Sequence, residues 1–178
     1  MHVQGALMIE HRLIERMIKI IERKLAQIKK EHKADPAFID SAVDFIRTYA
    51  DRTHHGKEED ILFRDLAGKN LSEDDSRMMK DLIEEHVFAR KTTKALADAN
   101  NWYRQGESAA LADIIEQLRT LVDFYPKHID KEDRIFFPSS RKYLSEQEDQ
   151  TILTEFEQFD KKMIHEKYET VVDLLETA

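Results

Sequence analysis

Apolar residues recur at intervals of three and four along almost the whole chain, and this helical period limits the fold more than any other feature. The first such series reads Leu7, Ile14, Ile18, Ile21, Leu25 and Ile28, with His11 at the position where another core residue is expected. Only 4 Gly and 3 Pro stand among the 178 residues, so few positions can break a helix. No strand pattern competes with the helical one. The sequence therefore predicts an all-α protein.

Start and stop signals divide the chain into five helices. We expect them over about residues 5–32, 36–66, 72–103, 108–138 and 145–176. Asp35 followed by Pro36 reads as an N-cap and a proline at the first helical position. Capping sequences begin at Ser72 and Ser145, and Pro138 is expected to end the fourth helix.

The lengths of these helices and of their connections predict the architecture. Each of the first four would be about 40–50 Å long at 1.5 Å per residue. Short connections make neighbouring helices antiparallel. We therefore expect one domain over residues 1–178. It would consist of an up-down-up-down four-helix bundle over about residues 5–140 and an additional C-terminal helix over about residues 145–176.

Composition excludes several classes of protein. The chain has no cysteine, which removes disulfides and thiolate metal sites. Lys+Arg is 28 and Asp+Glu is 36, and the net charge of 28 − 36 = −8 argues against binding to nucleic acid or to an anionic membrane. No apolar run approaches the roughly 18 residues of a membrane span, and no signal peptide is visible. We expect a cytoplasmic protein, with its oligomeric state left open.

Six polar side chains fall on the apolar stripes, where a core side chain is expected. They are His11, His54, Glu58, His86, His128 and Glu132. Each of the first four helices supplies a histidine, and two of the histidines are followed four residues later by a glutamate on the same helix face. Because the helices alternate in direction, all six should lie toward one end of the bundle.

Such a set of buried imidazoles and carboxylates needs a cation, since buried charges must be paired or bound to metal. Six ligands are too many for one tetrahedral zinc ion but suit two six-coordinate ions that share carboxylates. Imidazole with carboxylate suits iron, manganese or zinc. Iron is the metal that makes such a site chemically useful, so we predict two non-haem iron ions, with manganese or zinc possible.

Four segments carry a resemblance to a known family. They read IEHRLIER around His11, HHGKEEDILF from His54, EEHVFAR around His86 and YPKHIDKEDRIFFP around His128. The chain resembles the hemerythrin-like, HHE cation-binding domain over roughly residues 5–140. The resemblance implies a four-helix bundle with two irons near one end, held by the six residues above, with Glu58 and Glu132 bridging. It also implies a small diatomic molecule or peroxide as the ligand.

The chain departs from the oxygen-carrying members of this family. They have a second histidine four residues after the ligand of the third helix, where this chain has Arg90. Four histidines would leave one iron with fewer nitrogen ligands, which favours reactive or sensory chemistry over oxygen storage. The acidic ligand of the fourth helix also stands five residues after its histidine in those proteins. Asp133 has that spacing, but Glu132 fits the stripe better.

Some assignments stay open in the sequence. His55 and Glu59 repeat the spacing of His54 and Glu58 one residue later; we prefer the earlier pair, and expect the later one to be solvated rather than to orient a ligand. For Arg90 we expect either a pair with a buried carboxylate near the metals, such as Glu58 or Glu85, or a place at the surface. Two further positions are undecided: Tyr125 as a core aromatic or a partner of the site, and His165 as a surface residue or not.

The function predicted is that of a non-haem di-iron protein that binds or reacts with oxygen, peroxide or nitric oxide. Whether it turns over a substrate is open. An alternative is an iron-binding sensor or iron-handling protein without turnover, and a metal-free helical interaction module is a third. A ferritin-like oxidase is disfavoured because the chain has no Glu-x-x-His pair, and HExxH of zinc proteases is also absent.

Overall fold

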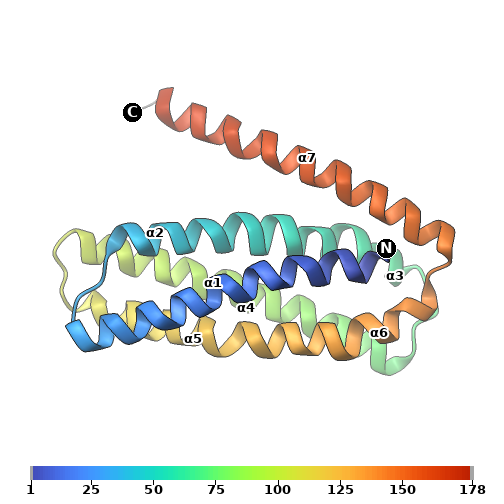
Figure 1. Cartoon of the computed structure of the whole chain (residues 1–178), viewed down its shortest axis with the longest axis horizontal. Coiled ribbons are helices and arrows are strands. Elements are labelled where there is room, and N and C mark those ends of the chain that lie inside the picture. The colour runs from blue at the N-terminus through green and yellow to red at the C-terminus, as the bar shows by residue number, and fades with distance from the viewer. Residues whose placement is uncertain (1, 177–178) are drawn as a thin grey trace.

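Long helices packed side by side make up the structure, a computed structural model that describes the backbone of residues 2–176 and the side chains of residues 2–164 and 167. No strand occurs within residues 2–176, which confirms the all-α class (Figure 1). None of the helices in this range combines the length and apolarity that crossing a membrane requires. The side chain of His165 lies outside the described residues.

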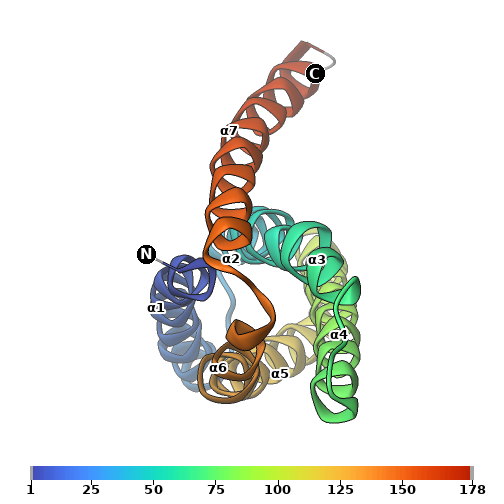
Figure 2. The same cartoon turned by 90° about the vertical axis from the view of Figure 1, so that its right-hand side faces the viewer.

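The helices follow the order expected from the sequence. The first helix is α1 (Val3–Glu31), and the third is α4 (Glu73–Arg104). The second consists of four consecutive segments: α2 (Pro36–Phe45), η1 (Ile46–His55), η2 (Glu58–Phe63) and α3 (Arg64–Ala67). The fourth consists of α5 (Ala110–Lys131), η3 (Glu132–Phe136) and α6 (Phe137–Ser140); the short turn η4 (Arg141–Tyr143) and the last helix, α7 (Glu146–Glu176), follow it. Helix α1 packs on α5, α5 on α4 and α4 on α2, so the first four helices form a closed bundle (Figure 2). Helix α7 lies outside this bundle, as an additional C-terminal helix.

The capping signals of the sequence act as expected at three helix starts. The carboxylate of Asp35 accepts a bond of 3.0 Å from the backbone N–H two residues on. The hydroxyl of Ser72 accepts from the backbone N–H of Asp75 at 3.2 Å. Ser145 and Glu148 form a reciprocal capping box, with bonds of 2.9 Å and 3.3 Å. These bonds satisfy backbone donors that a helix start leaves without an internal partner.

Three segments of the bundle are wound more widely than an α-helix. Elements η1, η2 and η3 are π-helical, with backbone bonds that skip one more residue than in an α-helix. A wider turn spreads consecutive residues over a smaller angle, so two neighbouring residues can both face inward. Segment η1 ends with His54 and His55, η2 begins with Glu58 and η3 begins with Glu132. The regular α-helical period that the sequence predicts does not hold there.

The expected end of the fourth helix at Pro138 is wrong, because the helix continues to Ser140. Pro138 lies in the first turn of α6, directly after the π-helical turn of η3. A proline is tolerated in a first turn, where its missing N–H costs no internal bond.

The core is divided into two apolar clusters. One is built mainly by Ile and Leu residues of α1, α2 and α5, such as Ile21, Ile39 and Leu118. The other is built by residues of α1, η2, η3, α6 and α7, among others, and includes Leu7, Leu62 and Phe136. On α1, His11 falls between these two clusters, and on the second helix His54 and Glu58 do so too. A polar layer therefore crosses the bundle between two apolar ones.

Candidate metal centre

The polar layer contains five buried histidines and two buried glutamates from all four bundle helices. They are His11 of α1, His54 and His55 of η1, Glu58 of η2, His86 of α4, His128 of α5 and Glu132 of η3, and each is at most 2% exposed. All six residues singled out in the sequence are thus brought together in one place. Their role as metal ligands stays a prediction.

Among the side chains that the structure describes, two groups could each hold a metal ion. One is His55, His86 and His128, and the other is His11, His54, Glu58 and Glu132. Within each group, one ligand atom per residue lies within 4.8 Å of all the others. The two glutamates reach both groups. Glu58 has one oxygen 3.6 Å from His54 Nε2 and the other 3.4 Å from His86 Nε2, and Glu132 lies 3.2 Å from His11 Nε2 and 3.4 Å from His128 Nε2.

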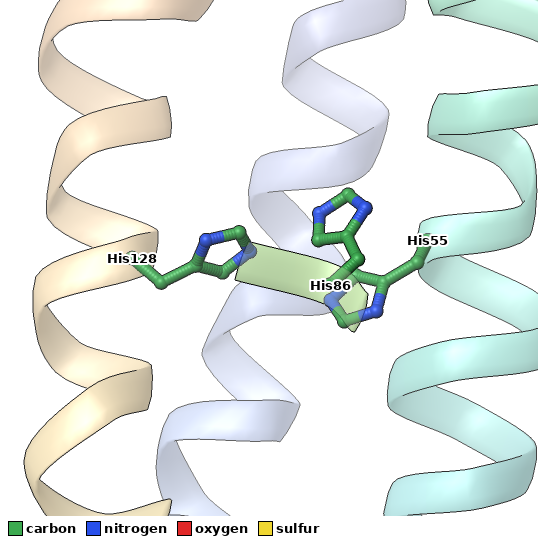
Figure 3. A group of neighbouring side chains, drawn as sticks. All are labelled: His55, His86 and His128. Atoms are coloured by element: carbon green, nitrogen blue, oxygen red, sulfur yellow. The ribbon is translucent and has the colours of Figure 1, made fainter. Parts of the chain in front are cut away.

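His55 is the residue that sequence reasoning missed. It was expected to be solvated, but it is 1% exposed. Its ring stacks on that of His86 with centroids 3.8 Å apart and meets the edge of His128 at 5.6 Å (Figure 3). The π-helical winding of η1 explains the difference, because it turns both His54 and His55 inward. The adjacent pair of histidines was the only signal, and it is ambiguous under an α-helical period.

The preferred pair of the second helix is placed as expected, with a further role for Glu59. Glu58 is buried within the layer, whereas Glu59 is 23% exposed and lies on its outer side. Glu59 is not simply solvated, since its carboxylate accepts from His86 Nδ1 at 2.7 Å. The residue at the alternative spacing therefore orients a member of the cluster.

Every histidine of the layer has its Nδ1 facing a carboxylate on the outside. The pairs are His11 with Asp133 at 2.6 Å, His54 with Glu10 at 2.9 Å, His55 with Asp51 at 3.4 Å, His86 with Glu59 at 2.7 Å and His128 with Glu85 at 2.8 Å. An ionised carboxylate can only accept, so Nδ1 carries the proton in each pair. The lone pair of each neutral imidazole is then on Nε2. This is the arrangement by which outer carboxylates orient histidines that bind metal.

Cations in turn hold these five carboxylates. Arg12 pairs with Asp133, Lys57 with Glu10 and Lys131 with Glu85. Arg90 serves two of them, with Asp51 at 2.7 Å and Glu59 at 2.6 Å. Arg90 thus pairs with carboxylates beside the cluster, as expected, but these are Asp51 and Glu59 and not Glu58 or Glu85. Its guanidinium instead fixes the carboxylates behind His55 and His86.

The inner atoms of the layer lack hydrogen-bond partners. Both oxygens of Glu58 and of Glu132 are buried and make no hydrogen bond, and the same holds for Nε2 of His86 and of His128. Buried polar atoms without a partner are rare and costly. Acceptor oxygens and imidazole lone pairs that converge in a dry interior suit a cation. The residues present therefore fit a metal centre.

The contact between His11 and His54 supports the same conclusion. Their Nε2 atoms are 2.8 Å apart, while both Nδ1 atoms already donate outward. Two lone pairs cannot face one another at that distance without a proton or a cation. Two imidazoles bound to one ion at right angles, with bonds of about 2.0–2.1 Å, would have nitrogens about 2.9 Å apart.

The pKa values of His11 and His54 allow a proton, in place of a cation, to lie between their Nε2 atoms. Burial lowers the pKa of His11, but the carboxylates of Asp133, bonded to Nδ1, and of Glu132, beside Nε2, more than offset it and raise the pKa to about 10. Burial lowers the pKa of His54 to about 4. The His11 imidazolium therefore donates from Nε2 to the neutral His54. Burial and the charge of Glu132 raise the pKa of Glu58 well above its usual value.

Glu132 and Tyr125 complete the description of the layer. Burial raises the pKa of Glu132, but the charge of His128 and the nearby imidazoles of His11 and His86 outweigh it and keep the pKa well below its usual value. Tyr125 is 1% exposed, as expected of a core aromatic, and its hydroxyl has no hydrogen-bond partner. It lines a cavity of about 270 Å³ together with Arg90 and other residues of η1 and α4.

One family matches the chain. The family model described as Hemerythrin HHE cation binding domain covers residues 2–140, which includes the whole polar layer. No curated protein and no solved structure matches the sequence at a significant level. The segment that matches a cation-binding family is therefore also the segment that carries a cluster of His and Glu side chains that could hold metal.

We predict that His55→Ala lowers the metal content of iron-loaded protein from about two ions per chain toward one, because it removes one of three imidazoles of its group. Plasma mass spectrometry on the purified variant measures this ratio, and circular dichroism checks that the helices are retained. His32→Asn, at an exposed position outside the layer, is the matched control. Equal metal content in both variants would show that His55 is not a ligand.

We also predict that metal binding at pH 7 releases the proton of His11, because ligands bind in their deprotonated form. Since the pKa of His11 is raised to about 10, apparent metal affinity should rise with pH from 7 toward 10 and fall as the solution is acidified. Calorimetric titrations in buffers of different ionisation enthalpy count the protons. Loading without proton release would contradict this account.

Proposed function

Because the chain belongs to the hemerythrin HHE cation binding family, we propose that it is a non-haem di-iron protein that binds or reacts with oxygen, peroxide or nitric oxide. One observation carries the proposal. Five buried histidines each have Nδ1 fixed by an outer carboxylate, so that Nε2 is the nitrogen of each ring that faces the two shared glutamates. A polar network that served only the fold would give hydrogen-bond partners to the carboxylate oxygens of Glu58 and Glu132 and to Nε2 of His86 and His128, which have none.

The ligands divide unequally between the two metal positions. His55, His86 and His128 would hold one ion, and His11 and His54 the other. Glu58 and Glu132 would contribute one oxygen to each ion, since their oxygens lie toward both groups. The group with His55, His86 and His128 would then offer an ion five protein ligands, and the group with His11 and His54 would offer four. The second side is therefore the more open to solvent or to a small ligand.

The fifth histidine changes an inference from the sequence. With four histidines, one ion would be short of nitrogen ligands, which spoke against stable oxygen binding. His55 would supply a third imidazole to the group with His86 and His128, in a chain that has Arg90 where the oxygen-carrying members have a histidine. The ligand count no longer favours reactive chemistry over reversible oxygen binding. Both belong to the proposal.

The protein contributes orientation and exclusion of water. Iron bound at this layer would supply the redox and small-molecule chemistry. The ring of Phe137 stacks over His11 with centroids 5.7 Å apart, and Phe124 over His128 at 5.2 Å. The two apolar clusters close the layer on both sides. Their side chains keep the cluster dry, which strengthens electrostatic interactions within it.

The test is exposure of anaerobically iron(II)-loaded protein to oxygen, peroxide or nitric oxide while its visible spectrum is recorded. We expect a new charge-transfer band with at least one of these molecules. Glu58→Gln, which removes a carboxylate shared by both ions, should lose the band. Repeated additions separate turnover from simple binding. Iron-loaded protein that responds to none of the three would contradict the proposal and favour an iron-handling role.

A further inference from the structure

A buried lysine joins the polar layer to the C-terminal helix. Lys57 lies between His55 and Glu58 in the sequence and is 2% exposed. Its ammonium pairs with Glu10 of α1 and, at 2.7 Å, with Asp160 of α7. The ring of Phe156, also on α7, lies 5.6 Å from the same ammonium. A buried charge is tolerated only when it is paired, and one of the two carboxylates that pair with Lys57 belongs to α7.

Glu10 extends this connection to a member of the metal centre. One of its oxygens pairs with Lys57, and the other accepts from His54 Nδ1 at 2.9 Å. Burial raises the pKa of Glu10, but His54 and Lys57 outweigh it and keep the carboxylate ionised. A continuous series of contacts therefore runs from His54 through Glu10 and Lys57 to Asp160. Of the four cations around the layer, Lys57 is the one that pairs with α7 among the side chains that the structure describes.

Close packing at Gly56 brings α7 against the same turn of the second helix. A Cβ atom at Gly56 would lie 2.8 Å from the ring of Phe159, nearer than carbon atoms approach without a shift. The absence of a side chain between His55 and Lys57 thus permits the direct contact of α7 with the helix that carries two of the histidines. Phe159 packs with the apolar cluster on that side of the layer.

Helix α7 lies beyond residues 2–140, the range that the family model covers. Figure 1 shows that it begins at the end of the bundle near the N-terminus and then leans away from the other helices. A cavity of about 670 Å³ lies between its middle part and the second helix, lined by Glu10, Tyr49, Asp160 and Met163 among others. The contacts at Phe156, Phe159 and Asp160 are therefore near the point where α7 departs.

We propose that docking of α7 on the bundle strengthens metal binding at the centre, with Asp160 as a positioning residue for His54. Asp160 holds Lys57, Lys57 holds Glu10, and Glu10 fixes the ring of His54 for the two-histidine metal position. Metal affinity then depends on whether α7 is docked. By thermodynamic linkage, metal binding strengthens the docking of α7 by the same factor. The inference rests on metal binding at the layer and not on which small molecule reacts there.

The decisive variant is Asp160→Asn, which keeps the size of a partly exposed side chain and removes its charge. We expect it to weaken zinc or iron(II) binding by roughly three- to tenfold, somewhat less than the 10- to 100-fold typical of a group that touches a ligand directly. Competition with a chromophoric chelator measures the affinity. The matched control is Glu155→Gln, which breaks the α7 ion pair with Arg64 at 3.0 Å and leaves Lys57 untouched.

Hydrogen exchange of the unmutated protein gives a second and independent readout. Metal should slow exchange of the α7 amides around residues 152–162, and this protection should be lost in Asp160→Asn but kept in Glu155→Gln. A merely structural role for α7 would weaken metal binding equally in both variants or leave both unchanged. Either result, or α7 exchange that is insensitive to metal, overturns the proposal.

The outcomes also separate this inference from the proposed function. Protein that binds zinc or iron(II) but does not respond to oxygen, peroxide or nitric oxide contradicts the proposed reaction alone, and the comparison of the two variants still decides the role of α7. Unmutated protein that binds no metal overturns both.

Discussion

The bond from histidine Nδ1 to an outer carboxylate is the interaction on which the rest of this structure depends. It occurs five times, from four helices, and it decides where the lone pairs of five buried imidazoles can be. Without it each ring could flip or change tautomer, and the inner nitrogens would not converge. The cations behind the carboxylates, above all Arg90 and Lys57, keep those acceptors ionised and in place.

This polar layer makes the bundle a compromise between stability and chemistry. Glu58 and Glu132 are 0% exposed and have no hydrogen-bond partner, an arrangement that costs free energy in a dry interior. Apolar clusters on both sides of the layer supply the burial that offsets this cost. A metal ion that binds only the folded chain would add to stability by mass action. The layer thus costs free energy on its own, and a bound cation would stabilise it.

The sequence was sufficient wherever the helices follow the regular α-helical period. Capping residues such as Ser72 and Ser145 located helix starts, and the stripe positions of His11, His86 and His128 placed these residues inside. Where the winding changes it was incomplete: it placed His54, Glu58 and Glu132 inside but not His55. His55 is turned inward by a π-helical segment, and π-helical winding has no period that can be read from one sequence. The outer partners were also beyond reach, because pairs such as Arg90 with Asp51 join residues 39 positions apart on different helices.

We propose that two metal ions bind in this layer, held by five histidines and two shared glutamates. The most direct measurement is a crystal structure of iron-loaded protein with anomalous diffraction collected on both sides of the iron absorption edge. The account predicts two anomalous peaks in the layer, one contacted by Nε2 of His55, His86 and His128, the other by Nε2 of His11 and His54, with Glu58 and Glu132 between them. A single peak, or peaks only at the protein surface, would contradict it.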